Sequence, residues 1–367
     1  MQGQWIGNFF GDNKGHITLN LEKIDDQLLG HTILVDHNNR IPSSIAKLKI
    51  EKIKDGTYLG QLTGFLPINP ETLLPSPWEN IKHFFDSTVT IPSTGTINFT
   101  LADSRTISGT WRTEISTKGN FTLTKSAADQ TSNFPCIKQT WAEFKKFIST
   151  LDIRLHIFRG QPTLKRLRTS YHRTGRSDIS RYIAHIPELK KRIYTQINHH
   201  FNLNNPEEYA ALLSLAQHYG YPTPLLDWSR SPYVAAYFAY AGLTKECKNE
   251  SVRIFVFNSI DWQNNTMRVD HIDSPILSIT PIAALPILNN RAQPQQSVTT
   301  FTNVDDVETF IQQYETRNNA KYLTIIELPA EEKSKVLNEL YIMNINAGLL
   351  FPGLDGICRM LKEMHFL

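Results

Sequence analysis

Cysteine is scarce in this sequence, and long apolar runs are missing from it. Cys136, Cys247 and Cys358 are odd in number, far apart and outside any C-x-x-C pair. We therefore expect reduced thiols in a reducing compartment rather than a disulfide framework. No run of about 18 apolar residues is present to cross a membrane. The start, MQGQWIGNFFGDNKG, lacks the basic and apolar regions of a secretion signal. These absences predict a cytoplasmic protein without a membrane partner.

Several motifs that accompany cofactors and nucleophiles are also missing. No G-x-G-x-x-G follows an expected strand and no G-x-x-x-x-G-K occurs, so neither a dinucleotide-binding Rossmann domain nor a P-loop is indicated. The histidines have no H-x-x-x-H spacing and no cysteine partners at ligand spacing, so we expect no bound metal. A G-x-S-x-G nucleophile elbow is absent as well.

The composition is that of a folded protein with more than one core. Hydrophobic residues make up 40% of the chain and charged residues 20%, which is ordinary for a globular protein. A length of 367 residues exceeds one ordinary core, so we expect two domains. The net charge of +3 is too small to draw the whole molecule to nucleic acid, and only a local patch could do so.

Residues 1–125 alternate apolar and polar side chains, as half-buried strands do. The alternation is clearest in residues 15–24, 46–51, 97–101 and 121–123. Asp55-Gly56 and Gly119-Asn120 supply residues that hairpin turns favour. We therefore predict a small antiparallel β-barrel domain over residues 1–125. The polar, aperiodic residues 126–138 would be a linker.

Two tryptophans suggest how this barrel closes. Trp5 lies near one end of the segment and Trp111 near the other, which suits first and last strands that meet and leave no free edge. The G-x-W motifs that contain them resemble the start of calycin barrels, such as lipocalins and avidins. Two interpretations stay open: the tryptophans plug the barrel as core residues, or a ligand cavity lies inside.

Residues 139–367 mix expected helices and strands without strict alternation. Thr140 opens a capping box, and Asn205-Pro206 and Ser231-Pro232 are typical helix starts. Short strands are expected at residues 154–158, 223–228, 253–257 and 322–328. This order favours an α+β fold rather than a doubly wound sheet.

Four motifs in this region combine unusual polar residues. They are Phe158-Arg159-Gly160-Gln161, LRTSYHR at 167–173, LAQHYGYPTPLLDWSRSPYVAAYFA at 215–239, and LLFPGLDGI at 349–357 preceded by RAQPQQSVTTF at 291–301. Arg159 ends an expected strand, and its planar fork suits phosphate. Gly160 has no side chain to block the close approach of a ligand. The second motif belongs to a basic run, residues 164–192, which is either a solvated face or a contact for nucleic acid or a diphosphate.

Together the four motifs resemble the FRG domain family, whose pattern contains F-R-G-Q, T-S-x-x-R, A-Q-H-x-G-x-P-T-x-L-L-D-W-[ST] and L-F-P-x-L-D-G. The resemblance covers roughly residues 140–365. Two positions depart from the pattern: Pro224 stands where arginine is common, and Ser297 where glycine is common. The contact made by that arginine is therefore not carried over.

The family resemblance implies a layout similar to the ADP-ribosyltransferase superfamily. The expected fold is then an N-terminal antiparallel β barrel followed by a mixed α+β ADP-ribosyltransferase-like domain. It implies NAD as the substrate, with Arg159 anchoring a phosphate or ribose, Ser229 on the nicotinamide ribose and Gln296 in place of the usual glutamate. The other residues that the resemblance implies at the site are Asp227 as a reserve carboxylate, Arg173 as a second diphosphate contact, and Gln161, His218 and Trp228.

The missing glutamate leaves the function open. No Glu occurs between Ser251 and Val307, and loss of a preorganised electrostatic group commonly costs about 10²–10³ in rate. The chain is then a slow transferase, a transferase that uses Asp227, or a nucleotide- or partner-binding module without turnover. A nucleic-acid binder that works through the basic run is a third hypothesis.

Purely structural roles are the alternative to ligand binding at three of these residues. Arg159 could pair with Asp355, Trp228 could be core, and His218 could interact with a helix dipole. Effectors of the implied kind are often bacterial toxins or phage-defence proteins with a protein or nucleic-acid target. The barrel would recognise that target or a trigger.

Overall fold

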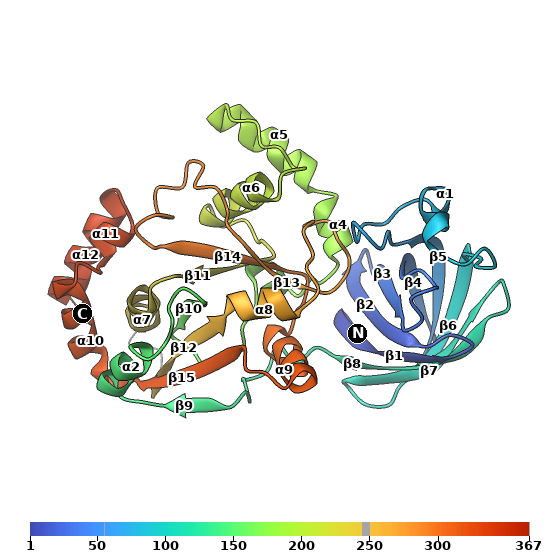
Figure 1. Ribbon diagram of the computed structural model, residues 1–367, viewed down its shortest axis with the longest axis horizontal. Helices are drawn as coiled ribbons and strands as arrows, with labels where there is room; N and C mark the ends of the chain where they lie inside the picture. Colours follow the sequence, from blue (N-terminus) through green and yellow to red (C-terminus); the bar gives the residue numbers. More distant parts are fainter. Residues whose placement is uncertain (55, 244–249, 367) are drawn as a thin grey trace.

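The computed structural model describes residues 1–54, 56–243 and 250–366, which form two domains lying side by side (Figure 1). Cys247, the expected free thiol, and Asp55 of the expected hairpin turn lie outside the described residues. No helix in the described part of the chain has the length and apolarity needed to span a bilayer.

The first domain is a closed antiparallel barrel. Its strands are β1 (Gly3–Gly11), β2 (Gly15–Ile24), β3 (Gln27–Asp36), β4 (Ser44–Lys54), β5 (Thr57–Pro67), β6 (Thr94–Leu101), β7 (Thr106–Thr113) and β8 (Lys118–Lys125). Each strand pairs with the next, and β8 closes on β1 with Trp5 opposite Lys125. The predicted barrel is confirmed, but Trp111 lies on β7 and not on the closing strand. The helices α1 (Trp78–Ile81) and η1 (Lys82–Phe84) lie between β5 and β6.

The second domain is built on one mixed sheet. Its strand order is β13 (Ile279–Ile282), β14 (Ser297–Thr302), β11 (Leu225–Ser229), β10 (His156–Gln161), β12 (Ser251–Asn258), β15 (Leu323–Pro329) and β9 (Cys136–Lys138). The pairs are antiparallel apart from β15 with β9. The predicted α+β class is confirmed. Residues 136–138 of the segment expected as a linker form the edge strand β9.

Helices cover both faces of this sheet. One face packs on α2 (Trp141–Ile148), α7 (Pro232–Ala241), η2 (Ala330–Glu332), α10 (Lys333–Ile342), α11 (Ala347–Leu350) and α12 (Leu354–Phe366). The opposite face packs on α8 (Ser259–Asn265) and α9 (Val307–Asn318). A further core under β11, β13 and β14 contains α3 (Ser170–Arg173), α4 (Ile179–Ile183), α5 (Ile186–Ile197) and α6 (Pro206–His218).

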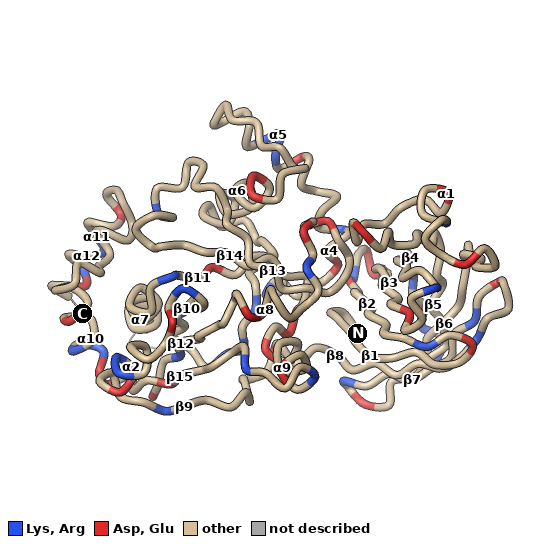
Figure 2. The backbone as a smooth tube through the Cα atoms, viewed as in Figure 1, with Lys and Arg blue, Asp and Glu red and all other residues tan. Residues whose placement is uncertain are grey.

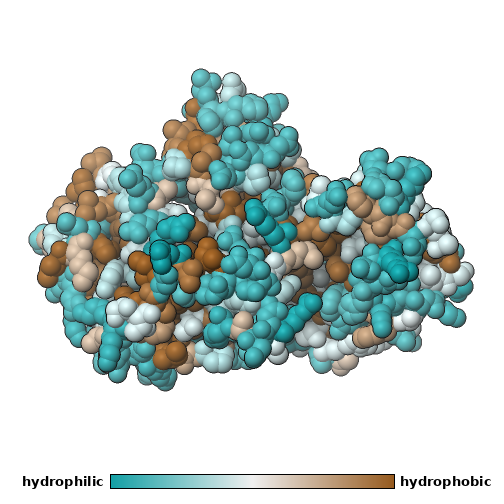
Figure 3. Space-filling view, in the orientation of Figure 1, coloured by the Kyte–Doolittle hydropathy of each residue, from teal (hydrophilic) through white to brown (hydrophobic). Residues whose placement is uncertain are grey.

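The predicted helix starts have the geometry that their sequences indicate. Thr140 and Glu143 form the predicted capping box of α2. Asn205 and Ser231 each accept a backbone N–H at the start of α6 and α7. The predicted strand at 154–158 begins later than expected, at His156. At the far end of the chain, apolar side chains of α11 and α12 reach the surface (Figure 3), including Leu354 at 81% exposed.

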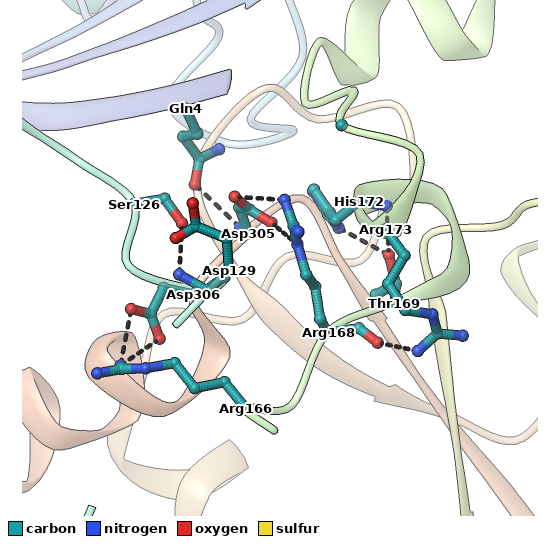
Figure 4. Close-up of polar contacts among 12 residues, drawn as sticks. Gln4, Ser126, Asp129, Arg166, Arg168, Thr169, His172, Arg173, Asp305 and Asp306 are labelled. Atoms are coloured by element: carbon teal, nitrogen blue, oxygen red, sulfur yellow. Dashed lines mark hydrogen bonds and ion pairs between the residues drawn. The ribbon is translucent and has the colours of Figure 1, made fainter. Parts of the chain in front are cut away.

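Two ion pairs and a hydrogen bond join three segments of the chain near the domain boundary. Arg166 and Asp306 contact each other at 2.9 Å with side chains 6% and 8% exposed. Arg168 donates to Asp305 at 2.5 Å beside them, and Gln4 of the barrel accepts the backbone N–H of Asp305 at 3.0 Å (Figure 4). The domains therefore meet through polar contacts as well as apolar ones, such as the packing of Ile276 against Ile33 and Ile45.

The substitution Arg166→Ala should lower the free energy of unfolding by about 3–5 kcal/mol, because it leaves the Asp306 carboxylate buried without its partner. Denaturant unfolding followed by tryptophan fluorescence measures the change. The matched control is Arg154→Ala, which removes an arginine that is 85% exposed and pairs with Asp152 at 2.7 Å; it should leave the free energy nearly unchanged. Similar losses in the two variants would contradict the assignment.

Candidate functional site

An arginine-lined pocket of about 250 Å³ lies beside β10 and β11. Its lining residues are Arg159, Arg168, Ser170, Arg173, Gln217, Gly220, Tyr221, Leu225, Leu226 and Asp227. The two strands pair only at Phe158 and Ser229, so they separate beyond that point. We call this cavity the arginine pocket.

Arg159 lies where the two strands separate. Its Nη1 donates to the backbone oxygen of Asp227 at 2.5 Å, and its Nε is buried with no hydrogen-bond partner among the described residues. Burial lowers the pKa of Arg159, and the neighbouring Asp227 opposes that shift. The alternative prediction, an ion pair between Arg159 and Asp355, is wrong. Asp355 pairs with Arg291 at 2.9 Å, and no carboxylate of the described segments forms an ion pair with Arg159.

Gly160 serves packing rather than ligand approach. A Cβ at this position would lie 1.7 Å from the backbone oxygen of Ala235 in α7. Only glycine lets β10 pack this closely on the helix. The expectation that Gly160 leaves room for a ligand is therefore replaced by a structural role, and Arg159 reaches the pocket from a strand fixed against α7.

Two further arginines line the pocket, and they differ in whether a carboxylate pairs with them. The charge of Arg168 is met by Asp305, which accepts from Nε at 2.5 Å and from Nη2 at 3.1 Å. Arg173 instead donates from Nη1 to the backbone oxygen of Arg168 at 2.7 Å and has no ion pair within the described parts of the chain. Arg173 is exposed to solvent; partial desolvation and the charge of Arg168 lower its pKa, and Asp227 opposes that shift. Arg159 and Arg173 thus leave positive charge uncompensated in one pocket.

Asp227 places one carboxylate beside these two guanidinium groups. It is exposed to the pocket but enclosed by protein on its other sides, and this desolvation raises its pKa, while Arg159 opposes the shift. Gln217 donates from Nε2 to the Asp227 carboxylate, and Thr223 donates to Gln217 Oε1. This chain of hydrogen bonds fixes the carboxylate at the pocket wall.

The other predicted site residues lie outside the arginine pocket. Ser229 is buried, donating to the backbone oxygen of Gln295 at 2.7 Å and accepting the N–H of Ser231. Trp228 is 4% exposed in the core and donates to Thr300 Oγ1 at 2.9 Å.

Three more of these residues face other surroundings. Gln161 donates to the carbonyl oxygens of Thr163 and Lys165 and so shapes its own loop. His218 lies near Arg291, which together with burial lowers its pKa. Gln296 is exposed, with a φ of 47°, in the loop before β14. The structure therefore brings together Arg159, Arg173 and Asp227.

Sequence reasoning did not single out Gln217, Thr223 or Ser170. Ser170 lines the pocket and accepts the N–H of Thr223 at 2.9 Å. The motifs could have indicated them, because Gln217 and Thr223 belong to the long motif at 215–239 and Ser170 to the motif at 167–173.

Three arginines of the basic run at 164–192 form ion pairs within the chain. Arg166 and Arg168 are paired with acids of the segment before α9, and Arg192 pairs with Glu188 at 2.5 Å. Lys and Arg positions alternate with Asp and Glu positions over both domains (Figure 2). The ion pairs of Arg166, Arg168 and Arg192 offset part of the charge that the basic run could offer to nucleic acid.

The barrel contains a cavity of about 580 Å³ at the end where β1 ends and β2 begins. Phe9, Leu62, Phe65 and Trp111 line it together with the loops around Arg40 and Val89. Trp5 is 1% exposed in the packed core of the barrel. Trp5 is therefore a core residue, and Trp111 packs against the same core while lining the cavity.

Comparison with known proteins places the arginine pocket in a described family domain. Residues 154–248 match the model of the FRG domain. The chain contains an FRG domain. Arg159, Arg173 and Asp227 all lie inside the matched segment of this FRG domain. A search of curated proteins finds no match.

Two solved structures are similar to part of the chain. One is a de novo designed fluorescence-activating β barrel, with 7% identity over 34% of this chain and 94% of that chain and a TM-score of 0.24. The other is a redesigned β barrel bound to DFHBI, with 11% identity over the same shares and a TM-score of 0.23. TM-scores this low carry no argument. The described residues hold no group of three or more His, Cys, Asp or Glu that could bind a metal ion.

The substitution Arg159→Ala should cost about 1 kcal/mol of unfolding free energy, because it removes one hydrogen bond and leaves no carboxylate without a partner. Thermal and denaturant unfolding measure this, with Arg166→Ala as the control that does leave a buried carboxylate unpaired. A loss at Arg159 as large as that at Arg166 would show that the Arg159 guanidinium is structural.

Proposed function

We propose that the FRG domain binds the ribose phosphate portion of NAD in the arginine pocket and acts as an ADP-ribosyltransferase-like effector. The observation that carries the proposal is the pair of guanidinium groups, Arg159 and Arg173, which form no ion pair in the described residues and have the single carboxylate of Asp227 near both. Guanidinium forks are the preferred protein ligands of phosphate.

The presence of Asp227 favours a ligand with hydroxyl groups as well as phosphate. A carboxylate beside the arginines repels a simple anion, but it accepts hydrogen bonds from hydroxyls. A ribose phosphate uses both kinds of group at once. Desolvation raises the pKa of Asp227, which is a common property of carboxylates in binding and catalytic sites.

The size of the pocket limits how much of the ligand it holds. Its volume of about 250 Å³ is below the range of about 300–1,000 Å³ for sites that enclose drug-sized ligands. A phosphate with its ribose would therefore fill the pocket, and the rest of NAD would extend outside it.

Transfer would break the bond between ribose C1′ and nicotinamide, whose nitrogen leaves with the bonding electrons. A nucleophile of the target would then bond to C1′ and lose its proton. The ionised Asp227 carboxylate would stabilise the positive charge that develops on the ribose. Asp227 would thus supply the negative charge that Gln296, which is exposed outside the pocket, does not carry.

A second candidate is a nucleotide-binding module without turnover. The observations that favour it are the buried hydroxyl of Ser229, which is used in internal hydrogen bonds, and the position of Gln296 away from the pocket. Both candidates share the same ligand site and differ only in nicotinamide release.

The remaining parts of the proposal concern the biological setting. A cytoplasmic effector, acting as a toxin or in phage defence on a protein or nucleic-acid target, follows from the FRG resemblance. The barrel would recognise the target or a trigger, and its apolar cavity offers a place for a small apolar signal.

The substitution Asp227→Asn tests the ligand class by changing two affinities in opposite directions. Loss of the negative charge should tighten binding of pyrophosphate and weaken binding of ADP-ribose, because the ribose hydroxyls lose a charged acceptor. Isothermal titration calorimetry measures both, with Arg159→Lys as a control that weakens both. A parallel change in the two affinities would contradict a ribose-phosphate site.

Nicotinamide release from NAD distinguishes the two candidates. With turnover, the rate should fall as the pH drops through the pKa of Asp227, because protonation removes the stabilising charge. That fall should begin at a higher pH than for an ordinary aspartate, since the pocket raises this pKa. Asp227→Asn should remove the pH dependence together with most of the rate. ADP-ribose binding without nicotinamide release at any pH would favour the binding module.

A further inference from the structure

The barrel contacts the segment that carries three lining residues of the arginine pocket, Arg168, Ser170 and Arg173. This segment, residues 168–182, lies between β10 and α5 and includes α3 and most of α4. Ser170 and Arg173 of α3 line the pocket. A helix of four residues is not stable without outside support. Whatever supports α3 therefore decides where the Arg173 guanidinium lies.

Glu22 of β2 supplies part of that support. Its side chain points out of the barrel, since Leu19 and Leu21 face the barrel core, yet it is 3% exposed. Glu22 Oε1 accepts a hydrogen bond from the hydroxyl of Tyr171 at 3.3 Å and from the backbone N–H of Asp178 at 3.4 Å. These contacts hold α3 and the start of α4 against the barrel.

Gln4 of β1 reaches the pocket by a second route (Figure 4). Its Oε1 accepts the N–H of Asp305 at 3.0 Å, and its Nε2 donates to the backbone oxygen of Asn303 at 2.9 Å. Asp305 accepts from Arg168 Nε at 2.5 Å, and the backbone oxygen of Arg168 accepts from Arg173 Nη1 at 2.7 Å. Hydrogen bonds thus lead from the barrel wall to a guanidinium in the pocket.

We propose that the barrel completes the arginine pocket, with Glu22 and Gln4 as positioning residues for Arg173. The inference rests on the proposed function, because it assigns control of the same ligand site to the barrel. Arg173 has no carboxylate partner in the described residues, so its place depends on α3 and on Arg168. A signal that shifts the wall of β1 and β2 therefore changes the affinity of the FRG domain for ribose phosphates.

Calorimetry of the full chain with ADP-ribose tests this coupling. Glu22→Ala removes the acceptor on the barrel and should weaken binding about tenfold, within the 5–150-fold range typical of coupled sites. Tyr171→Phe removes only the hydroxyl and should cause a smaller loss in the same direction, so one mild variant remains if Glu22→Ala folds poorly. Glu51→Ala is the control, because it removes a half-exposed barrel carboxylate paired with Lys49 and should leave the affinity unchanged.

A double substitution shows whether Glu22 acts through Arg173. Arg173→Ala should weaken ADP-ribose binding by itself, and adding Glu22→Ala should weaken it little further. Additive losses would overturn the inference. So would wild-type affinity in folded Glu22→Ala and Tyr171→Phe variants, although the pocket would then keep its proposed function.

Hydrogen exchange separates this inference from the proposed function. In the absence of ligand, Glu22→Ala should speed amide exchange in residues 168–181, whereas Arg159→Ala should not. If ADP-ribose fails to bind the wild-type protein, the proposed function fails. Faster exchange in Glu22→Ala would still support positioning by the barrel, and unchanged exchange would contradict it.

Discussion

Two buried ion pairs fix the arrangement on which the arginine pocket depends. Arg166 with Asp306 and Arg168 with Asp305 fasten the segment after β10 to the segment before α9. Separating either pair would leave a buried charge without a partner at a cost of several kcal/mol, so these segments have little freedom to move. Because Asp305 also contacts Gln4, the same short stretch of chain ties the barrel, the sheet and the pocket together.

Two arginines of the pocket, unlike Arg166 and Arg168, form no ion pair in the described residues. Arg168 has its carboxylate, but Arg159 and Arg173 bond to backbone oxygens and have no ion pair in the ranges that the structure describes. Arg173 is exposed, but the Arg159 Nε is buried without a hydrogen-bond partner among the described residues, and burying such a group costs free energy unless an anion offsets it. Asp227 offsets part of it, and its raised pKa shows that its own surroundings disfavour a carboxylate. A ligand that brings phosphate and hydroxyl groups satisfies both kinds of side chain.

Local patterns in the sequence predict the local parts of this structure. Alternation predicts the barrel, capping residues predict the starts of α2, α6 and α7, and the motif residues Arg159 and Asp227 do meet in one pocket. The sequence does not reveal that Gly160 faces α7, because which neighbour approaches a strand is a long-range property. The sequence does not predict the burial of Glu22 either. An outward-facing polar residue of a barrel normally meets water, and only the second domain buries it.

The proposed ligand site requires that Arg159 and Arg173 bind a phosphate of a nucleotide while Asp227 contacts its ribose. An experimental structure of the full chain with ADP-ribose tests this claim directly. We predict one phosphate between the two guanidinium groups and a hydroxyl of its ribose within hydrogen-bonding distance of the Asp227 carboxylate. ADP-ribose bound elsewhere with the pocket unchanged, or both guanidinium groups paired with carboxylates of the chain itself, would contradict it.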